Sequence, residues 1–278
     1  MAVVGANMNL FEWQRARLPE LREIHFAPMS FDDMTIVVYH FWEEPLFDPQ
    51  FDAVEAAVYE TWRHCGLIKT HLVVNRMSVR LETFAFQHSG VVDIRVNPAL
   101  VPGCVPSMSV DFNANLWRYF DTESVLVIQN DGFPLRPGLE EFRGCYDYVG
   151  APFIRKTVIN RMLGLWPRFA VGNGGFSLRS KRICEMASFY WQKRYHRMPA
   201  DWWGVREDCF YCVLLPLLER DYRRIVRFAP FETARRFAYD SLYNEMPESL
   251  PFGFHGQSAF RELIENDVFN PFKRGEGK

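Results

Sequence analysis

The apolar positions of this chain follow two alternating spacings, which predict strands and helices that succeed one another. Short β-branched runs are typical of buried strands, and apolar residues three or four positions apart are typical of helices. The patterns predict strands at residues 34–39, 70–75, 91–96 and 124–129, helices at 11–21, 51–65 and 210–218, and a helix that Asp111 caps and that runs to Phe120. Such alternation favours an α/β fold, in which a mainly parallel sheet carries helices on both faces.

The length and composition indicate one globular unit. The chain has 278 residues, of which 48% are hydrophobic and 24% charged, enough to bury one large core. A formal net charge of -2 with scattered Lys and Arg gives no electrostatic reason to expect a nucleic acid partner. The N-terminus lacks the features of a signal peptide, and no stretch has the length of a membrane span. We therefore expect a cytoplasmic protein, for which peripheral contact with the inner face of the membrane stays open.

Two of the six cysteines, Cys209 and Cys212, have the C-x-x-C spacing of redox and zinc sites. They stand in an apolar stretch, and no second Cys or His pair accompanies them to complete a zinc site. Buried, reduced core cysteines are the better interpretation.

Polar residues follow the predicted strands where parallel sheets usually bind their ligands. Ligands of such sheets collect outside the carboxyl ends of the strands. The candidates for nucleotide contact there are Tyr39, His40, Asn75, Asn130 and Asp131. A carboxylate at position 131 can reach a divalent ion that a diphosphate holds. The alternative is a structural Asp-Gly turn that closes the strand.

The stretch Gly172-Asn173-Gly174-Gly175-Phe176-Ser177 has too many glycines for a packed strand. It predicts a loop whose backbone a sugar or diphosphate approaches closely. The stretch has neither the lysine of a phosphate-binding loop nor the spacing of a dinucleotide fingerprint. The alternative is a tight connection to a helix that Ser180 caps.

The pair Glu207-Asp208 stands before the predicted apolar helix at residues 210–218. Acidic residues in a first helical turn are favoured by the helix dipole, so a cap is one interpretation. The other is catalytic, because a carboxylate in a partly desolvated cleft can take the proton of an acceptor hydroxyl.

Five segments together resemble one family of bacterial and fungal GT-A type glycosyltransferases, long catalogued as a domain of unknown function. These segments are Val125–Gly132, Asp147–Pro152, Val171–Arg179, Glu207-Asp208 and Phe252–Gly256, and the resemblance extends from residue 34 to about residue 255. It implies a Rossmann-like GT-A domain at residues 34–260. Residues 1–33 would form an N-terminal helical extension, and residues 261–278 a C-terminal tail.

The resemblance also implies roles for individual residues. Asp131 would stand at the metal position of the Asp-x-Asp motif, Gly174 and Gly175 in the glycine loop, Asp208 as the base and His255 as a second metal ligand. Apart from the resemblance, we expect Glu207 to orient or cap, with exchanged roles open, and Asp111 to lie near the base or ribose. The chain departs from the motif at its first acid, where Gln129 supplies an amide.

The implied reaction is transfer of a hexose from a nucleoside diphosphate sugar, UDP-sugars being favoured, to a glycan or lipid-linked acceptor in polysaccharide biosynthesis. Mn²⁺ or Mg²⁺ would assist. A single base fits direct displacement, and hence inversion. Two alternatives stay open: a non-catalytic carbohydrate-binding protein that stacks sugars on Trp166, Trp202 and Trp203, and a sugar-phosphate nucleotidylyltransferase. The latter needs a glycine-rich basic loop after the first strand, where this chain is acidic and aromatic.

Overall fold

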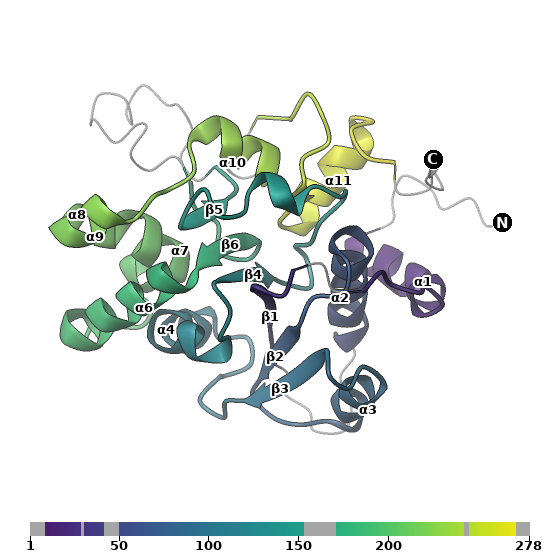
Figure 1. Cartoon of the computed structure of the whole chain (residues 1–278), viewed down its shortest axis with the longest axis horizontal. Helices are drawn as coiled ribbons and strands as arrows, with labels where there is room; N and C mark the ends of the chain where they lie inside the picture. Colours follow the sequence, from purple (N-terminus) through teal and green to yellow (C-terminus); the bar gives the residue numbers. More distant parts are fainter. Residues whose placement is uncertain (1–8, 29–30, 42–49, 153–170, 242–244, 271–278) are drawn as a thin grey trace.

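A six-stranded sheet forms the centre of the computed structural model, which describes residues 9–28, 31–41, 50–152, 171–241 and 245–270 (Figure 1). Its strands are β1 (Met34–His40), β2 (Thr70–Val74), β3 (Val92–Val96), β4 (Ser124–Ile128), β5 (Tyr148–Gly150) and β6 (Ser177–Ser180). They lie in the order β3-β2-β1-β4-β6-β5. The first four are parallel, and β6 runs antiparallel to both β4 and β5. The parallel part has the 3-2-1-4 order of doubly wound nucleotide-binding sheets.

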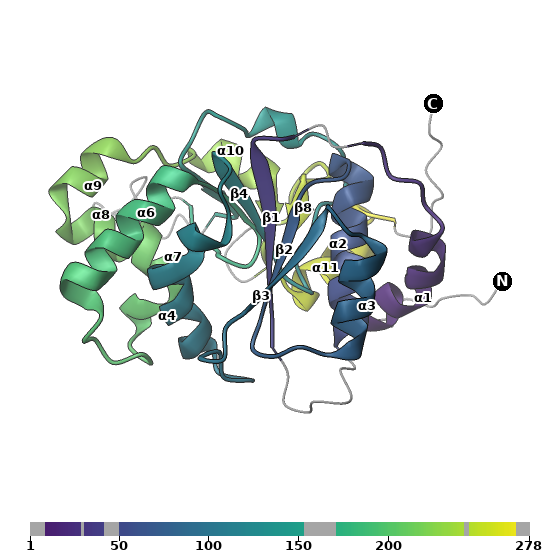
Figure 2. The same cartoon turned by 60° about the horizontal axis from the view of Figure 1, so that its bottom comes forward.

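Helices cover both faces of this sheet (Figures 1 and 2). On one side lie α1 (Leu10–Arg22), α2 (Phe51–Cys65), α3 (Val79–Gln87) and α11 (Gln257–Glu265). On the other lie α4 (Val105–Asn115), α6 (Lys181–Tyr190), α7 (Glu207–Cys209), α8 (Leu215–Leu218) and α9 (Arg220–Ile225). The helix α10 (Phe231–Phe237) precedes a second sheet, and short helical turns are η1 (Leu116–Tyr119), η2 (Leu139–Glu141), η3 (Trp191–Tyr195), η4 (Trp203–Val205) and η5 (Phe210–Leu214).

Side chains of the central strands alternate between two hydrophobic cores. Ile36 and Val38 of β1 pack in the core beneath α1 and α2, whereas Val37 and Tyr39 pack in the core beneath α4 and α6. Successive strand residues point to opposite faces, so a strand buried on both faces has a continuous apolar sequence. This accounts for the uninterrupted apolar runs of β1 and β4.

A second, two-stranded parallel sheet joins β7 (Ala238–Tyr239) to β8 (Gly253–Phe254). Pro134, a few residues after β4, forms a single bridge with Gly253 of this sheet. The bridge brings the C-terminal part of the chain beside the carboxyl end of β4.

The predicted α/β fold, with a mainly parallel sheet and flanking helices in a single domain, is confirmed. The four predicted strands are β1 to β4, and the predicted helices at residues 11–21 and 51–65 are α1 and α2. The prediction that Asp111 caps a helix is wrong, because α4 begins six residues earlier and Asp111 lies inside it. Within the described residues, no helix is both long and apolar enough to cross a membrane.

Candidate active site

A cavity of about 430 Å³ lies beyond the carboxyl end of β4. Six predicted site residues line it together: Asp131, Gly174, Gly175, Glu207, Asp208 and His255. Its other walls come from Val105, Met108, Gln129, Asn173, Arg206, Asp240, Ser241, Gly256, Gln257 and Ser258. These six residues come from four separate parts of the sequence and converge at the edge of the sheet where ligands are expected.

A tight turn positions Asp131. The backbone amides of Gln129 and Gly132 each donate to the carbonyl of the other, at 3.2 and 3.1 Å, so the chain reverses directly after β4. The turn is held from two sides: the amide of Gly256 donates to the carbonyl of Asp131 at 2.8 Å, and Nε2 of Gln14 in α1 donates to the carbonyl of Asn130 at 2.6 Å. The Asp-Gly turn is thus present, and it places Asp131 at the cavity. The role of Asp131 in binding an ion stays a prediction.

The small sheet places His255 between two carboxylates. The backbone amide of His255 donates to the carbonyl of Tyr239 at 2.9 Å, which continues the β7–β8 pairing. Oδ1 of Asp131 lies 3.6 Å from Nε2 of the imidazole, and Oδ2 of Asp240 lies 3.7 Å from Nδ1. Burial opposes protonation of the ring, but the interaction with Asp240 and the negative charge of Asp131 raise the pKa of His255 above its ordinary value.

The glycine loop is shaped by what lies against it. A Cβ on Gly174 would stand 1.8 Å from Oε1 of Glu207, and one on Gly175 would stand 1.9 Å from Nε2 of His255. Asn173 has a positive φ of 60°, and its side-chain amide donates to Asp240. Both glycines are thus required because carboxylate and imidazole groups occupy the space where side chains would be.

Glu207 and Asp208 differ in their access to the cavity. Glu207 is buried, and its Oε2 accepts a hydrogen bond of 3.1 Å from the hydroxyl of Ser109. Burial and the neighbouring charge of Asp208 raise the pKa of Glu207 above its ordinary value. Asp208 is only half-buried, and the backbone amide of Cys209 donates to its Oδ1 at 2.7 Å. Both carboxylates line the cavity, and Asp208 is the more exposed of the two.

A fully buried arginine lies behind this loop. The guanidinium of Arg179 is enclosed by the rings of Phe112, Tyr148 and Tyr211, with 4.8 to 5.1 Å between Cζ and the ring centroids. Its Nη2 donates to the carbonyl of Gly174 at 3.4 Å, and its charge favours the ionised form of Glu207. A buried cation needs such compensation, because an isolated one is costly to desolvate.

Five predicted nucleotide contacts do not line the cavity: Tyr39, His40, Asn75, Asp111 and Asn130. Asp111 is buried and accepts hydrogen bonds from the hydroxyl of Tyr39 at 2.9 Å and from Nδ2 of Asn97 and Asn115, each at 2.7 Å. Burial and the charge of Asp111 raise the pKa of Tyr39 well above its ordinary value. His40 and Asn75 are also buried, at the carboxyl ends of β1 and β2. Their role in nucleotide binding stays a prediction.

The nitrogen and oxygen atoms at the cavity suit a divalent ion whose coordination shell is completed by a bound ligand. Nε2 of His255 lies 3.1 Å from Oε1 of Gln129 and 3.6 Å from Oδ1 of Asp131, so one imidazole nitrogen and two oxygens face one another. Within the described residues, no group of three or more His, Cys, Asp or Glu side chains is arranged to hold a metal by itself. Mg²⁺ and Mn²⁺ commonly take one or two carboxylates and complete their shell with phosphate oxygens and water.

Sequence reasoning missed two residues of the site. Asp240 follows a strand of only two residues, which has no recognisable hydrophobic period. Asn173 lies in the glycine-rich stretch, but its left-handed backbone and its bond to Asp240 depend on the folded chain. An Asn before a glycine pair is the signal that could have indicated the turn.

The predicted core cysteines are confirmed as buried: burial raises the pKa of both Cys209 and Cys212.

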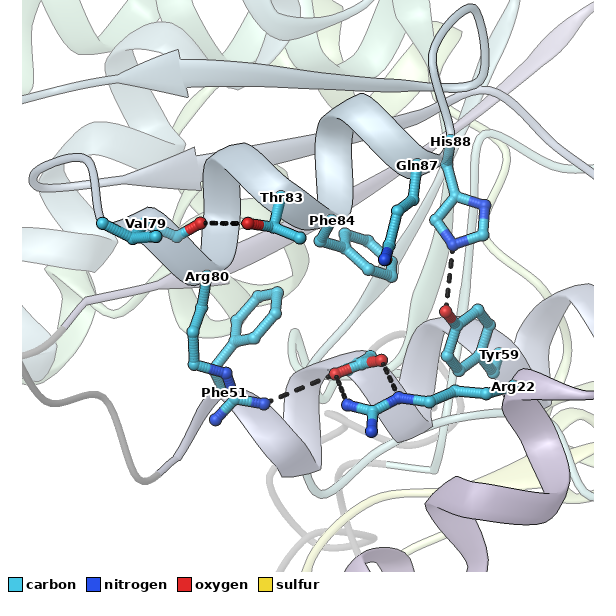
Figure 3. A pocket seen from close by; sticks show the side chains of 10 residues that line it. Arg22, Phe51, Tyr59, Val79, Arg80, Thr83, Phe84, Gln87 and His88 are labelled. Carbon is cyan, nitrogen blue, oxygen red and sulfur yellow. Dashed lines mark hydrogen bonds and ion pairs between the residues drawn. The ribbon is translucent and has the colours of Figure 1, made fainter.

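A second cavity, of about 530 Å³, lies between α1, α2 and α3 (Figure 3). Its charged groups already satisfy one another. Glu55 is buried and accepts two hydrogen bonds from Arg22, at 2.7 and 2.8 Å, and one from Arg80 at 3.5 Å. His88 shares a hydrogen bond of 2.9 Å with the hydroxyl of Tyr59. The residues that line this cavity therefore form a structural ion-pair cluster that links α1 to α2.

Replacing Glu55 with glutamine should destabilise the protein by about 2 kcal/mol, because Arg22 and Arg80 would lose the carboxylate between them. Chemical denaturation measures the loss. Glu20→Gln is the matched control on the surface, since Glu20 is exposed and, among the described residues, forms an ion pair with Arg17 alone; it should cost under about 0.5 kcal/mol. Equal effects of the two substitutions would contradict the assignment of Glu55 as the fastening residue.

A family model described as a protein of unknown function (DUF5672) matches residues 108–255, more than half of the chain. The chain belongs to this family. The matched segment begins at Met108 and ends at His255, both of which line the cavity. No curated protein sequence matches the chain.

Among solved structures, this member of the DUF5672 family is similar to several glycosyltransferases. The galactosyltransferase LgtC, in complex with donor and acceptor sugar analogues, is 16% identical over 84% of this chain and 95% of its own, with a TM-score of 0.47. The apo-form glycosyltransferase GlyE of Streptococcus pneumoniae is 13% identical over 85% and 60%, with a TM-score of 0.47. The mannosyltransferase PcManGT of Pyrobaculum calidifontis, in complex with GDP-Man and Mn²⁺, is 13% identical over 79% and 62%, with a TM-score of 0.40. The chain spans less than two thirds of the last two.

Proposed function

We propose that this protein is a glycosyltransferase that moves a hexose from a nucleoside diphosphate sugar to a glycan or lipid-linked acceptor. The observation that carries the proposal is the convergence of Asp131, the Gly174-Gly175 loop, Asp208 and His255 on one cavity. These are the residues whose motifs resemble GT-A glycosyltransferases. A UDP-sugar is the favoured donor.

Asp131 and His255 would hold a Mn²⁺ or Mg²⁺ ion, with Gln129 beside them. When bound, the ion supplies charge stabilisation for the departing nucleoside diphosphate. The turn at residues 129–132 and the β7–β8 sheet fix these side chains from two directions. Asp240 orients the imidazole from its other nitrogen, in the way that outer carboxylates commonly orient histidine ligands.

Asp208 would take the proton of the acceptor hydroxyl as that oxygen attacks the anomeric carbon. It is the half-buried member of the carboxylate pair and lines the cavity. Glu207 is fixed by Ser109 and packs against Gly174, so it supports the loop from behind. With one accessible base, direct displacement at the anomeric carbon is the simplest course, and it inverts the configuration.

Thermal unfolding across a panel of nucleoside diphosphates and their sugars, with and without Mn²⁺, tests donor and metal together. A matching nucleotide at saturating concentration should raise Tm by about 5 °C in the presence of the ion. Asp131→Ala should abolish the metal-dependent part of the shift, because it removes the carboxylate that we assign to the ion.

Asp201→Ala is the matched control, since Asp201 is exposed and does not line the cavity. It should keep the full shift. Absence of any nucleotide-dependent shift in the unaltered protein would remove the proposal. A metal-dependent shift that persists in Asp131→Ala would still support donor binding, but it would contradict the assignment of Asp131 as a metal ligand.

A further inference from the structure

Four large apolar side chains are exposed on neighbouring helices at one end of the molecule. Phe189 near the end of α6 and Leu218 at the end of α8 are each 56% exposed, and Leu217 and Ile225 are 47% and 39% exposed. Figures 1 and 2 show α6, α8 and α9 together at the end opposite α1. Soluble proteins rarely expose several large apolar side chains close together, so such a group is typical of a contact surface.

Polar and aromatic contacts hold these helices together. Oε1 of Glu219, between α8 and α9, accepts hydrogen bonds from the hydroxyl of Tyr195 at 2.8 Å and from Nη1 of Arg194 at 3.0 Å. The rings of Tyr190 and Tyr222 meet edge to face, with 6.2 Å between their centroids. The exposed side chains of α8 and α9 are therefore fixed beside the end of α6.

The same helices concentrate positive charge. Residues 181–197 and 215–227 contain nine Lys and Arg but three Asp and Glu, in a chain whose formal net charge is -2. Arg220, Arg223 and Arg224 are exposed, and the structure shows no ion pair of theirs with any residue that it describes. Nζ of Lys193 lies 5.2 Å from the centroid of the Phe189 ring. Arg220, Arg223 and Arg224, which form no ion pair with a described residue, thus accompany the apolar side chains. Arg182, Arg194 and Arg227 do form such pairs.

We propose that this face, formed by the end of α6 and by α8 and α9, docks the protein on an anionic lipid bilayer. Leu217, Leu218 and Phe189 enter the headgroup region, and Arg223 and Arg224 bind lipid phosphates. The proposal goes beyond glycosyl transfer and does not depend on it, because none of these residues lines the active-site cavity.

Charge complementarity argues for a bilayer as the occupant. A nucleic acid would neutralise the arginines but leave Leu217 and Leu218 in water. A second copy of the chain would place the same arginines against one another, and like charges repel. An anionic bilayer can bind the arginines and bury the leucines together, since headgroup phosphates and acyl chains lie within one side-chain length of each other.

Co-sedimentation of the full chain with vesicles tests the proposal. We expect binding to phosphatidylcholine vesicles that contain about one third phosphatidylserine, weak binding to phosphatidylcholine alone, and loss of binding as salt rises. The double substitution Arg223→Gln with Arg224→Gln should weaken binding to anionic vesicles about 30-fold. Leu217→Ser with Leu218→Ser should also weaken binding while its salt dependence stays, because insertion and charge act separately.

The matched control is Arg15→Gln with Arg261→Gln, which removes two exposed arginines from α1 and α11 at the opposite end. It should bind vesicles like the unaltered protein. Equal binding to both kinds of vesicle, or unchanged affinity of the Arg223 and Arg224 variant, would overturn the proposal. So would binding to duplex DNA as tight as to anionic vesicles, or a solution dimer that the Leu217 and Leu218 substitutions dissociate.

Discussion

Asp208→Asn is expected to lower kcat about a thousandfold while nucleotide binding is kept. Asn has the same shape as Asp but no basic oxygen, so the acceptor hydroxyl would keep its proton. The fold should tolerate the change, because Asp208 is half-buried and its oxygen Oδ1 can still accept the hydrogen bond from the Cys209 amide. Steady-state kinetics with the donor found by thermal unfolding gives kcat, and the Tm shift with that donor gives binding.

Glu207→Gln is the informative comparison for Asp208→Asn. It should lower stability and raise KM more than it lowers kcat, because Glu207 is buried behind Gly174 and bonded to Ser109. Asp201→Asn, on an exposed residue outside the cavity, should change neither quantity. A fully active Asp208→Asn variant would remove the role of base from Asp208, and a kcat loss confined to Glu207→Gln would transfer it to Glu207.

Gly175→Ala is expected to abolish metal-dependent nucleotide binding. The added Cβ would stand 1.9 Å from Nε2 of His255 and 2.6 Å from Oε1 of Gln129, both far below contact distance. His255 cannot simply turn away, because its backbone is paired with Tyr239 and its ring lies between Asp131 and Asp240. We expect a destabilisation of about 2 kcal/mol from overpacking. Isothermal calorimetry with nucleotide and Mn²⁺ measures binding, and chemical denaturation measures stability.

Gly90→Ala is the matched control for Gly175→Ala. Gly90 has a positive φ of 88°, so alanine there is strained, but the added Cβ would meet no atom within 4 Å. It should cost about 1 kcal/mol of stability and leave nucleotide binding intact. If Gly175→Ala bound nucleotide and metal as the unaltered protein does, the close approach of His255 to the loop would have no part in binding.

Much of the fold could be predicted because its central strands are buried on both faces. The apolar runs of β1, β2 and β4 and the helical period of α2 each have one strong local interpretation, and the structure confirms them. The strands β7 and β8 have two residues each, too few for any period, and their pairing depends on contacts between distant parts of the chain. Asp240, which follows β7, was missed for that reason.

Some of the predicted site residues line the cavity, and others are buried elsewhere in the fold. Asp131, Gly174 and Asp208 each stand in a motif or directly after a buried strand, and all three line the cavity, as the sequence led us to expect. Tyr39 and Asp111 have the same polar character in the sequence, but they bond to each other inside the core beneath α4. A local pattern does not distinguish a polar residue that meets a ligand from one that meets another buried polar residue, because burial is a property of the whole fold.

The turn that presents Asp131 owes part of its rigidity to Gln14, whose side chain spans from the carbonyl of Ala53 in α2 to that of Asn130. The segment that identifies the family begins only at residue 108. One contact that holds the turn at residues 129–132 therefore lies outside the segment on which relatives are recognised. Relatives that share the matched segment but lack a residue equivalent to Gln14 would carry the same motifs on a turn that is held less firmly. Under the proposed function, their turnover would then differ without any change at a motif residue.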